Sequence, residues 1–377
     1  MAIFRSTLRT IQIVNVRWFN ATAWYGMELA RLLNNAGHRT LTLGLGGTLS
    51  FEQARKMDLD PIALPLTSNN PAVLARLTRD LRRLIQDFNP DVINCHRGES
   101  FLLFGLLKKW GNYTLVRTRG DQRLPKNNLP NRLLHQRAAD AVIATNSVMA
   151  RYFVETLHLE PGHVHTILGG VDTARFHFDA AGREEVRARY GFRPEHQVIG
   201  LLGRFDRVKG QKELIEAAAA LIRDGHPNVR LLLLGFATAT SREEVERWIQ
   251  DAGMREFTVI SGKVEDVPAH ISALDVGVVA SLWSETIARA ALEIMACRRP
   301  LISTSVGVMP DLLPQEALCA PGDVPALTAL LRRALAETGS YREMLLQAQE
   351  TRMRDLDSAH FLEKTLHVYE RALSARR

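Results

Sequence analysis

Short apolar segments alternate with longer amphipathic segments through almost all of the 377 residues. In the first half, the apolar segments that we expect to be strands are residues 11–16, 40–43, 92–94, 114–117 and 141–144. Amphipathic stretches of helical length separate them, for example Glu28 to Ala36, which Gly37 ends. Because parallel strands need crossover helices between them, this alternation predicts an α/β architecture.

The alternation stops and restarts once, which predicts two domains. Mixed polar sequence fills residues 171–194, with a charged helical piece at 183–190, and a new strand begins at 198–202. Later strands are expected at 229–234, 257–260, 276–279 and 300–303, with helices opening near Gln211, Ser241, Val267 and Glu285. We expect one α/β domain over 1–178, a second over 195–357, and a C-terminal helix of about 358–377 that packs back on the first.

Several classes of protein are disfavoured by the sequence. The longest apolar runs, such as residues 231–234, are far shorter than the roughly 18 residues of a membrane-spanning helix. The start, Met1 to Arg5, lacks the apolar stretch of a signal peptide. Three distant cysteines, Cys95, Cys297 and Cys319, predict neither a disulfide framework nor a zinc site. We therefore expect a cytoplasmic protein.

Positive charge is concentrated in the first half of the chain. Residues 1–195 hold 26 Lys+Arg and 17 Asp+Glu (26 − 17 = +9), and residues 196–377 hold 22 and 24 (22 − 24 = −2). Such a domain suits an acidic substrate, an anionic membrane or a nucleic acid, or carries ordinary solubilising charge. We find no nucleic-acid recognition motif and expect no nucleic-acid partner. The aromatic residues Trp18, Phe19, Trp24 and Tyr25 either contact a membrane or belong to the core.

A glycine-bounded basic loop, residues 203–210, follows the strand that ends at Leu202 and precedes a helix. Gly203 and Gly210 allow close backbone approach, and Arg204 and Lys209 are long enough to reach one diphosphate at the strand ends. The alternative is a solvated basic turn.

Two carboxylates, Glu285 and Glu293, lie eight residues apart in a segment that we expect to begin a helix. Eight steps of about 100° would leave them about 80° apart in azimuth and about 12 Å apart along the axis. They would then contact two ends of an extended ligand but would not share a metal ion. Alternatively, the first offsets the helix dipole and the second is surface filler.

Together these two elements resemble the GT-B glycosyltransferases of the retaining family 4, also called group 1. The segment Gly169-Gly170-Val171-Asp172 with Phe176 is similar to the family's segment at the exit of the first domain. Residues 296–307 and 321–323 resemble the stretches that follow the second carboxylate. The resemblance covers essentially the whole chain and implies two Rossmann-like domains that face each other across a cleft.

The resemblance also implies roles for individual residues. Arg204 and Lys209 would hold the diphosphate of a nucleotide-sugar donor, Glu285 would face the hydroxyls of the donor sugar, and Glu293 would face the ribose. Beside Gly203, further donor contacts are expected from the backbone N–H groups of Thr286, Ile287 and Ala288, at a helix start, and from Arg289. No metal or other cofactor is implied, because the two cations and the helix end neutralise the leaving diphosphate.

Some positions depart from the family pattern. Thr286-Ile287-Ala288 replaces the usual glycine-rich turn, which reshapes the sugar pocket, and Arg289 suits a charged donor or a phosphate. Residues 20–26 lack the glycine pair that usually follows the first strand, and Arg119-Gly120-Asp121 stands where many members have a histidine.

The acceptor-side candidates follow strands of the first domain, where α/β folds bind ligands. They are His96, Arg97, Arg119, Asp121 and Arg123. For His96 the alternative is a strand-end histidine with satisfied hydrogen bonds. The arginines, with Arg117 and Lys126 nearby, suit phosphate or carboxylate groups, or else are solvated surface charge.

The sequence thus predicts a retaining, metal-independent glycosyltransferase that uses a nucleotide-sugar donor and a glycan or lipid-linked acceptor, anionic as in lipopolysaccharide or another envelope glycan. It would be cytoplasmic, with peripheral contact to the inner face of an anionic plasma membrane. The alternative is a sugar-nucleotide or glycan-binding scaffold with little turnover.

Overall fold

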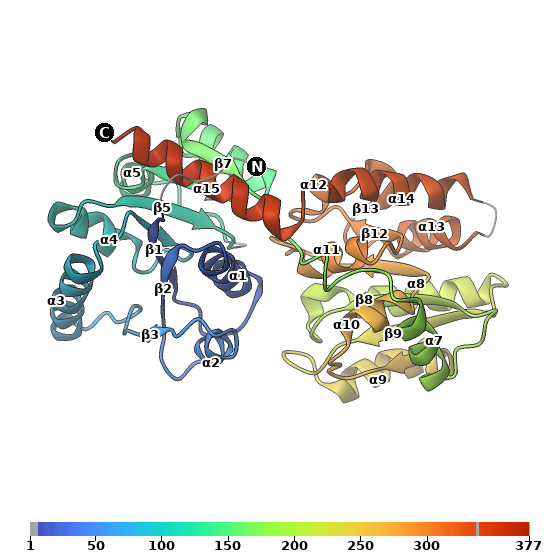
Figure 1. Ribbon diagram of the computed structural model, residues 1–377. Coiled ribbons are helices and arrows are strands. Elements are labelled where there is room, and N and C mark those ends of the chain that lie inside the picture. Colours follow the sequence, from blue (N-terminus) through green and yellow to red (C-terminus); the bar gives the residue numbers. More distant parts are fainter. Residues whose placement is uncertain (1–6, 122, 337–338, 377) are drawn as a thin grey trace. The chain divides into compact units, whose positions relative to one another are not determined.

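The computed structural model describes residues 7–121, 123–336 and 339–376, so the expectation for Met1 to Arg5 lies outside the described residues. The chain divides into two compact units. The N-terminal unit comprises Met1–Gly169 and Ala359–Arg377, and the C-terminal unit comprises Gly170–Ser358. Each unit is an α/β layer structure with helices on both faces of one sheet (Figure 1).

The elements of the N-terminal unit alternate as the sequence predicts. Its strands are β1 Arg9–Val14, β2 Arg39–Gly44, β3 Ile62–Ala63, β4 Val92–Cys95, β5 Thr114–Arg119, β6 Ala141–Ala144 and β7 Val164–Thr166. Its α-helices are α1 Ala21–Asn35, α2 Leu49–Lys56, α3 Pro71–Phe88, α4 Phe101–Leu107, α5 Leu129–Leu133, α6 Ser147–Arg151 and α15 Ser358–Ser374. Short 3₁₀ or π turns are η1 Lys108–Trp110, η2 Leu134–Ala138, η3 Tyr152–Thr156 and η4 Pro161–His163.

The C-terminal unit repeats the alternation. Its strands are β8 Gln197–Leu202, β9 Val229–Leu234, β10 Thr258–Ile260, β11 Val276–Val279, β12 Leu301–Thr304 and β13 Leu318–Cys319. Its α-helices are α7 Ala180–Arg189, α8 Gln211–Arg223, α9 Arg242–Asp251, α10 Val267–Ser272, α11 Arg289–Ala296, α12 Met309–Leu312, α13 Val324–Leu335 and α14 Ser340–Met353. The 3₁₀ turns are η5 Arg207–Lys209, η6 Arg255–Phe257 and η7 Gln315–Ala317.

Both sheets are parallel and doubly wound. The strand order is β3-β2-β1-β4-β5-β6-β7 in the first and β10-β9-β8-β11-β12-β13 in the second. The order reverses between β1 and β4 in one sheet and between β8 and β11 in the other. Loops diverge at such a reversal and leave space at the carboxyl ends of the strands, where these folds bind ligands. The predicted site loops follow β4, β5, β8 and β11.

Local signals explain where many helices begin. Asn70 caps α3 by accepting hydrogen bonds from the backbone N–H groups of Ala72 and Val73, and Pro71 follows at the first helical position. Asp266 caps α10 in the same way through Ala269. These caps satisfy N–H groups that the helices leave unpaired, which fixes the loop-to-helix turns next to the strand ends.

The C-terminal helix α15 is tied to the sheet of the N-terminal unit. Tyr369 is fully buried, and its hydroxyl accepts hydrogen bonds from the side-chain amides of Asn94 (2.8 Å) and Gln12 (3.3 Å). These amides project from the central strands β4 and β1, where an unpaired polar group would be costly. Tyr369 thus provides a hydrogen-bond acceptor for two polar side chains in the core.

Residues 170–178, which the sequence prediction assigns to the first domain, group with the C-terminal unit. The backbone N–H of Val171 donates to Leu356 (2.9 Å), and that of Ser358 donates to Val171 (3.0 Å). This ladder joins the start of the C-terminal unit to its end. Among the described residues, no helix is both long enough and apolar enough to cross a membrane.

Candidate functional site

The basic loop after β8 is held in a compact turn. Asp206 accepts a hydrogen bond from the backbone N–H of Val208 (3.1 Å) and caps η5. It also pairs with Arg204, whose Nη1 lies 2.5 Å from Oδ2 of Asp206 and whose side chain is 46% exposed. A side-chain carbon at Gly203 would lie 3.7 Å from Cδ of Lys209, so the lysine stem crosses this glycine. The loop thereby directs Lys209 across the end of β8.

A second loop, residues 280–288, follows β11 and contacts the first. The backbone N–H of Leu282 donates to the carbonyl of Val208 (2.8 Å). Gly210 has φ +70°, and a Cβ there would lie 1.9 Å from the carbonyl oxygen of Ala280. Only glycine permits both this conformation and this contact. The ends of neighbouring strands are therefore joined backbone to backbone.

Lys209 and Glu285 meet where these loops touch. Nζ of Lys209 lies 2.7 Å from Oε2 of Glu285, and the hydroxyl of Ser281 donates to the same oxygen (2.6 Å). The Glu285 side chain is 9% exposed and the Lys209 side chain 24%. A buried carboxylate needs such partners, because unpaired burial of its charge is costly. The structure thus brings together two residues that are 76 positions apart, as the proposed site requires.

The backbone of Glu285 is fixed from a third side. Its carbonyl accepts a hydrogen bond from the N–H of Val308 (2.8 Å). Gly307, at φ +62°, passes so close that a Cβ there would lie 1.9 Å from this carbonyl oxygen. The loop after β12 therefore sets the position of Glu285.

The expected helical start at Glu285 is wrong. Helix α11 begins at Arg289, and Ala288 before it has a left-handed conformation (φ 53°). Glu285 lies in the loop because its carbonyl is held by Val308 instead of by a helical N–H four residues ahead. The azimuth and axial separation calculated for a continuous helix therefore do not apply to Glu285 and Glu293.

The same shift moves the helix terminus away from Thr286 and Ile287, which precede it. The side chains of Ile287 and Ala288 are buried, so these residues present only their backbones to a ligand. Glu293 lies on α11, is buried, and accepts a hydrogen bond from Nε of Arg289 (2.6 Å). The helix dipole places its positive end at Ala288 and Arg289.

Each candidate cation of the C-terminal unit thus has an acidic partner: Arg204 with Asp206, Lys209 with Glu285, and Arg289 with Glu293. The three pairs sum to zero charge. An incoming diphosphate would compete with these carboxylates for the cations, so the pairs hold the cations in place and tune their attraction for an anion.

Three arginines surround Asp121 in the N-terminal unit. Its carboxylate lies 3.3 Å from Nη1 of Arg97, 3.2 Å from Nη1 of Arg119 and 3.6 Å from Nη2 of Arg117. Arg97 is also paired with Glu99. The group lies at the carboxyl ends of β4 and β5. Its formal charge is 3 − 2 = +1.

Arg117 is fully buried, so the solvated-surface interpretation is wrong for this residue. Its Nη1 donates to the carbonyl oxygens of Cys95 (2.7 Å) and Thr118, whereas Nε and Nη2 have no hydrogen-bond partner among the described residues. Burial, and next the nearby charge of Arg119, lower the pKa of Arg117 to about 10, so it stays protonated at neutral pH.

His96, at the end of β4, is buried with 1% exposure. Its Nε2 lies 2.9 Å from Oε1 of Gln12, and Nδ1 has no hydrogen-bond partner among the described residues. Burial and then the charge of Arg117 lower the pKa of His96 to about 3. The imidazole is therefore neutral at physiological pH, and since Oε1 of Gln12 accepts, the proton belongs on Nε2.

Arg123 is placed differently from its predicted neighbours. Its side chain is exposed, and its carbonyl oxygen accepts a hydrogen bond from Nη2 of Arg119. Gln122, between it and Asp121, lies outside the described residues. Arg123 therefore supports the cluster through its backbone.

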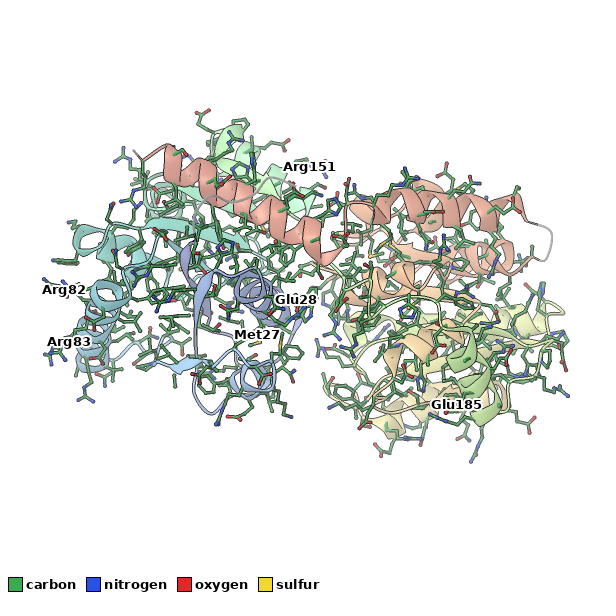
Figure 2. The ribbon with its side chains drawn as sticks, viewed as in Figure 1. Met27, Glu28, Arg82, Arg83, Arg151 and Glu185 are labelled. Atoms are coloured by element: carbon green, nitrogen blue, oxygen red, sulfur yellow. The ribbon has the colours of Figure 1, made fainter. Side chains whose placement is uncertain are left out.

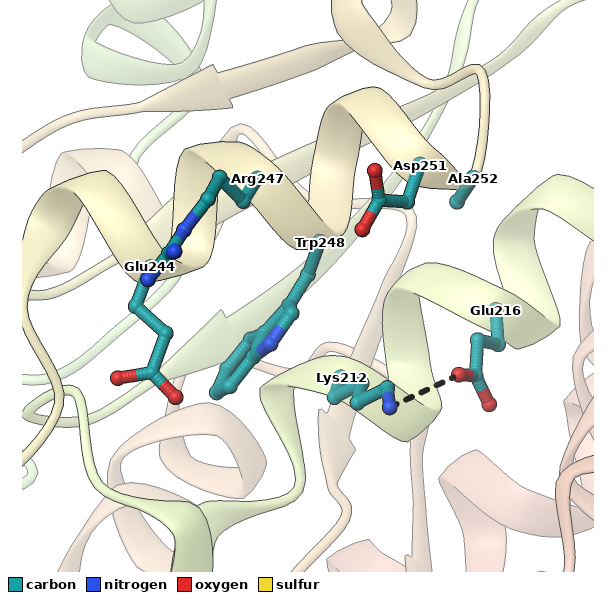
Figure 3. Close-up of a pocket in the computed structure, with 7 residues that line it drawn as sticks. All are labelled: Lys212, Glu216, Glu244, Arg247, Trp248, Asp251 and Ala252. Carbon is teal, nitrogen blue, oxygen red and sulfur yellow. Dashed lines mark ion pairs between the residues drawn. The ribbon is translucent and has the colours of Figure 1, made fainter.

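A pocket of about 490 Å³ lies elsewhere, between α8 and α9 (Figure 3). It is lined by Lys212, Glu216, Glu244, Arg247, Trp248, Asp251 and Ala252. This lining holds none of the residues that the sequence predicts for the site. The donor-side residues are instead gathered by loop contacts.

Sequence reasoning missed Ser281 and Asp206, which position Glu285 and Arg204. The role of Asp206 could have been predicted, since an aspartate before a turn is a typical helix cap. The role of Ser281 could not have been predicted, because a serine after a strand has many roles. The contact between His96 and Gln12 could not be predicted either, because Gln12 lies within a strand far away in sequence.

Two family models match most of the chain: "Glycosyl transferases group 1" over residues 182–351 and "Glycosyltransferase Family 4" over residues 22–175. An alpha-maltose-1-phosphate synthase from Mycolicibacterium smegmatis is 29% identical over 252 residues, which are 62% of this chain and 64% of that protein. A mannosylfructose-phosphate synthase from Agrobacterium fabrum is 31% identical over 191 residues, 48% of this chain and 41% of that protein. The aligned parts thus span less than two thirds of either relative.

The crystal structure of Anabaena HepE in complex with UDP and glucose superposes with a TM-score of 0.81 at 17% identity, and covers 96% of this chain and 99% of that one. At this identity the likeness concerns the fold, which is GT-B with two Rossmann-like domains. Because the two family models together match residues 22–175 and 182–351, the chain belongs to the group 1 glycosyl transferases, which are the glycosyltransferases of family 4.

Proposed function

We propose that this protein is a retaining glycosyltransferase that moves a sugar from a nucleotide-diphosphate donor to an anionic glycan or lipid-linked acceptor. One observation carries the proposal: Lys209, Glu285 and Ser281 meet at the carboxyl ends of β8 and β11, where the strand order reverses. A lysine fixed beside a buried carboxylate offers one group for a phosphate and one for sugar hydroxyls.

The donor chemistry follows from charge. When the bond between the anomeric carbon and the diphosphate oxygen breaks, its electron pair stays on the leaving phosphate. Lys209 and Arg204 would stabilise this charge more in the transition state than in the ground state, which accelerates the step. Glu285 would accept hydrogen bonds from sugar hydroxyls and Glu293 from the ribose. We propose no protein nucleophile and therefore favour attack by the acceptor on the face that the phosphate leaves.

The arginine cluster supports an anionic acceptor. Arg97, Arg117 and Arg119 carry three charges against the two of Asp121 and Glu99, and the Arg97 side chain is 33% exposed. A phosphate or carboxylate of the acceptor would pair with this exposed guanidinium group. Two relatives are named for phosphorylated sugars. A phosphorylated lipopolysaccharide core or another envelope glycan, made at the cytoplasmic side of the membrane, fits this chemistry.

The test is an assay of nucleoside diphosphate release from UDP-, GDP- and ADP-sugars, with glucose 1-phosphate or glucose as model acceptor. We expect release that the phosphorylated acceptor accelerates more than the neutral one, undiminished by EDTA, and an NMR product spectrum that shows retained anomeric configuration. Donor binding without any release would instead indicate the scaffold alternative. Loss of activity in EDTA that Mg²⁺ restores would contradict the metal-independent mechanism.

A further inference from the structure

Helices α3 and α4 of the N-terminal unit form a surface that is both basic and apolar. The guanidinium carbon of Arg82 on α3 lies 5.5 Å from the ring centroid of Trp110, at the end of η1, so these residues are neighbours. The two helices follow strands of the parallel sheet, α3 after β3 and α4 after β4, and they contact each other.

Large apolar side chains on this surface are exposed to solvent. Leu102 is 56% exposed, Leu106 51% and Trp110 47%. Leu102 and Leu106 are four residues apart in α4 and share one face, and Trp110 continues the line into η1. Isolated exposed apolar residues need no explanation, but a row of three beside cations marks an interaction surface.

The basic and acidic side chains of α3 lie on different sides of the helix. With about 100° per residue, and Arg82 taken as the origin, Arg79 and Arg83 lie within about 100° on the outward side, whereas Asp80 and Asp87 lie about 140–160° away on the far flank. Figure 2 shows Arg82 and Arg83 extending from α3 away from the sheet. The acids of this helix therefore point away from the row of apolar residues.

Next to Trp110, one lysine is neutralised and the other is not. Nζ of Lys108 lies 2.7 Å from Asp140, whereas Lys109 is exposed and takes part in none of the ion pairs formed by the described residues. The same holds for Arg79 and Arg82. The basic–apolar face, which we define as Arg79, Arg82, Lys109, Leu102, Leu106 and Trp110, thus carries three unneutralised cations.

We propose that the basic–apolar face docks the protein on an anionic phospholipid surface. Lysine and arginine at the rim pair with lipid phosphates, and leucine and tryptophan side chains enter the boundary between headgroups and acyl chains. A second copy of the chain is a poor occupant, because a symmetric contact would set the same cations against each other. A nucleic acid would leave the two leucines without a partner. The proposal is independent of the donor chemistry.

This surface differs from the one that the aromatic sequence near residue 20 indicates. Tyr25 is buried, and its hydroxyl donates to the carbonyl of Ile167 (3.0 Å), so this residue belongs to the core. Trp18 is 69% exposed but has no neighbouring exposed leucines in sequence.

The test is co-sedimentation of the full chain with vesicles of phosphatidylglycerol and phosphatidylcholine in equal parts, and with vesicles of phosphatidylcholine alone. We expect binding to the anionic vesicles that weakens as salt is added. Arg79→Gln combined with Arg82→Gln should lower the partition coefficient about 25-fold, about fivefold for each cation removed. Trp110→Ala should lower it at all salt concentrations.

The control variant combines Arg223→Gln with Arg255→Gln, two exposed arginines of the C-terminal unit, and changes the net charge equally. It should bind as the parent does. Three results would each overturn the proposal: equal binding to both vesicle types, equal losses in the two double variants, or binding to RNA without binding to anionic vesicles. Donor turnover in solution, measured in parallel, shows whether the proposed reaction survives independently of the outcome.

Discussion

Replacing Lys209 by methionine is expected to lower kcat/KM for sugar transfer about a hundredfold or more, the range found when one donor to a developing oxyanion is removed. Methionine keeps the unbranched stem that crosses Gly203 but deletes the charge at 2.7 Å from Glu285. Because the lost interaction is stronger in the transition state, kcat should fall as well as the affinity for the donor. Steady-state kinetics at limiting and saturating donor measure both.

The variant also leaves the buried Glu285 without its cation, so its stability must be tested apart from its activity. The double variant Lys209→Met with Glu285→Gln removes the uncompensated charge and should regain thermal stability without regaining transfer.

The matched control is Lys212→Met on α8, where Nζ lies 3.9 Å from Glu216 and both side chains are 45% exposed. This variant should stay within about twofold of the parent, since exposed pairs contribute little. Equal losses in Lys209→Met and Lys212→Met would refute the assignment of Lys209.

Replacing Gly307 by alanine is expected to lower the stability of the C-terminal unit by about 3 kcal/mol, from left-handed backbone strain and from overpacking. The new Cβ would lie 1.9 Å from the carbonyl oxygen of Glu285. This contact is with backbone atoms, so no flexible side chain can move to relieve it. For a unit of this size, the melting temperature should fall by roughly 10 °C. The folded fraction should also transfer sugar more slowly, because Glu285 is displaced.

The variant Gly262→Ala distinguishes the cost of backbone strain from the cost of the steric clash that Gly307→Ala would also create. Gly262 has φ +72°, close to the +62° of Gly307, but a Cβ there would meet nothing within 4 Å. Its cost should be about 1 kcal/mol from backbone strain alone, with transfer unchanged. If calorimetry gave both variants the same melting temperature, the contact between Gly307 and Glu285 would not fix the site.

Each of the ten strands predicted from short apolar runs overlaps a strand of the structure, but β3, β7 and β13, which are only two or three residues long, were missed. Residues 141–144, 229–234 and 276–279 match β6, β9 and β11 to the residue. Parallel topology then places the loops after β8 and β11 at one sheet edge, so the proximity of Lys209 and Glu285 follows from the pattern.

The shape of the second loop could not be predicted from the sequence. Residues 284–293 have local helix-forming character, yet the first five form a loop because Val308 and Gly307 hold Glu285 from 22 or more residues away. Contacts of this range override local propensity. The helical geometry expected for the two glutamates failed for this reason.

The burial of Arg117 was hidden for a similar reason. An arginine in a strand normally faces solvent. Here the carbonyl of Cys95, the ring of Phe101 and the carboxylate of Asp121 together accommodate its charge. None of these partners is a neighbour in sequence except Asp121, four residues away. The basic–apolar face likewise depends on a contact between residues far apart in sequence, that of Arg82 with Trp110.

The most direct test of the account is calorimetric titration of the parent protein with UDP, GDP and ADP and with the matching monophosphates. If Lys209 and Glu285 form a diphosphate site, the preferred diphosphate should bind at least about tenfold more tightly than its monophosphate. Lys209→Met should remove that preference, whereas Lys212→Met should keep it. Equal binding of mono- and diphosphate by the parent protein, or an undiminished preference in Lys209→Met, would contradict the account.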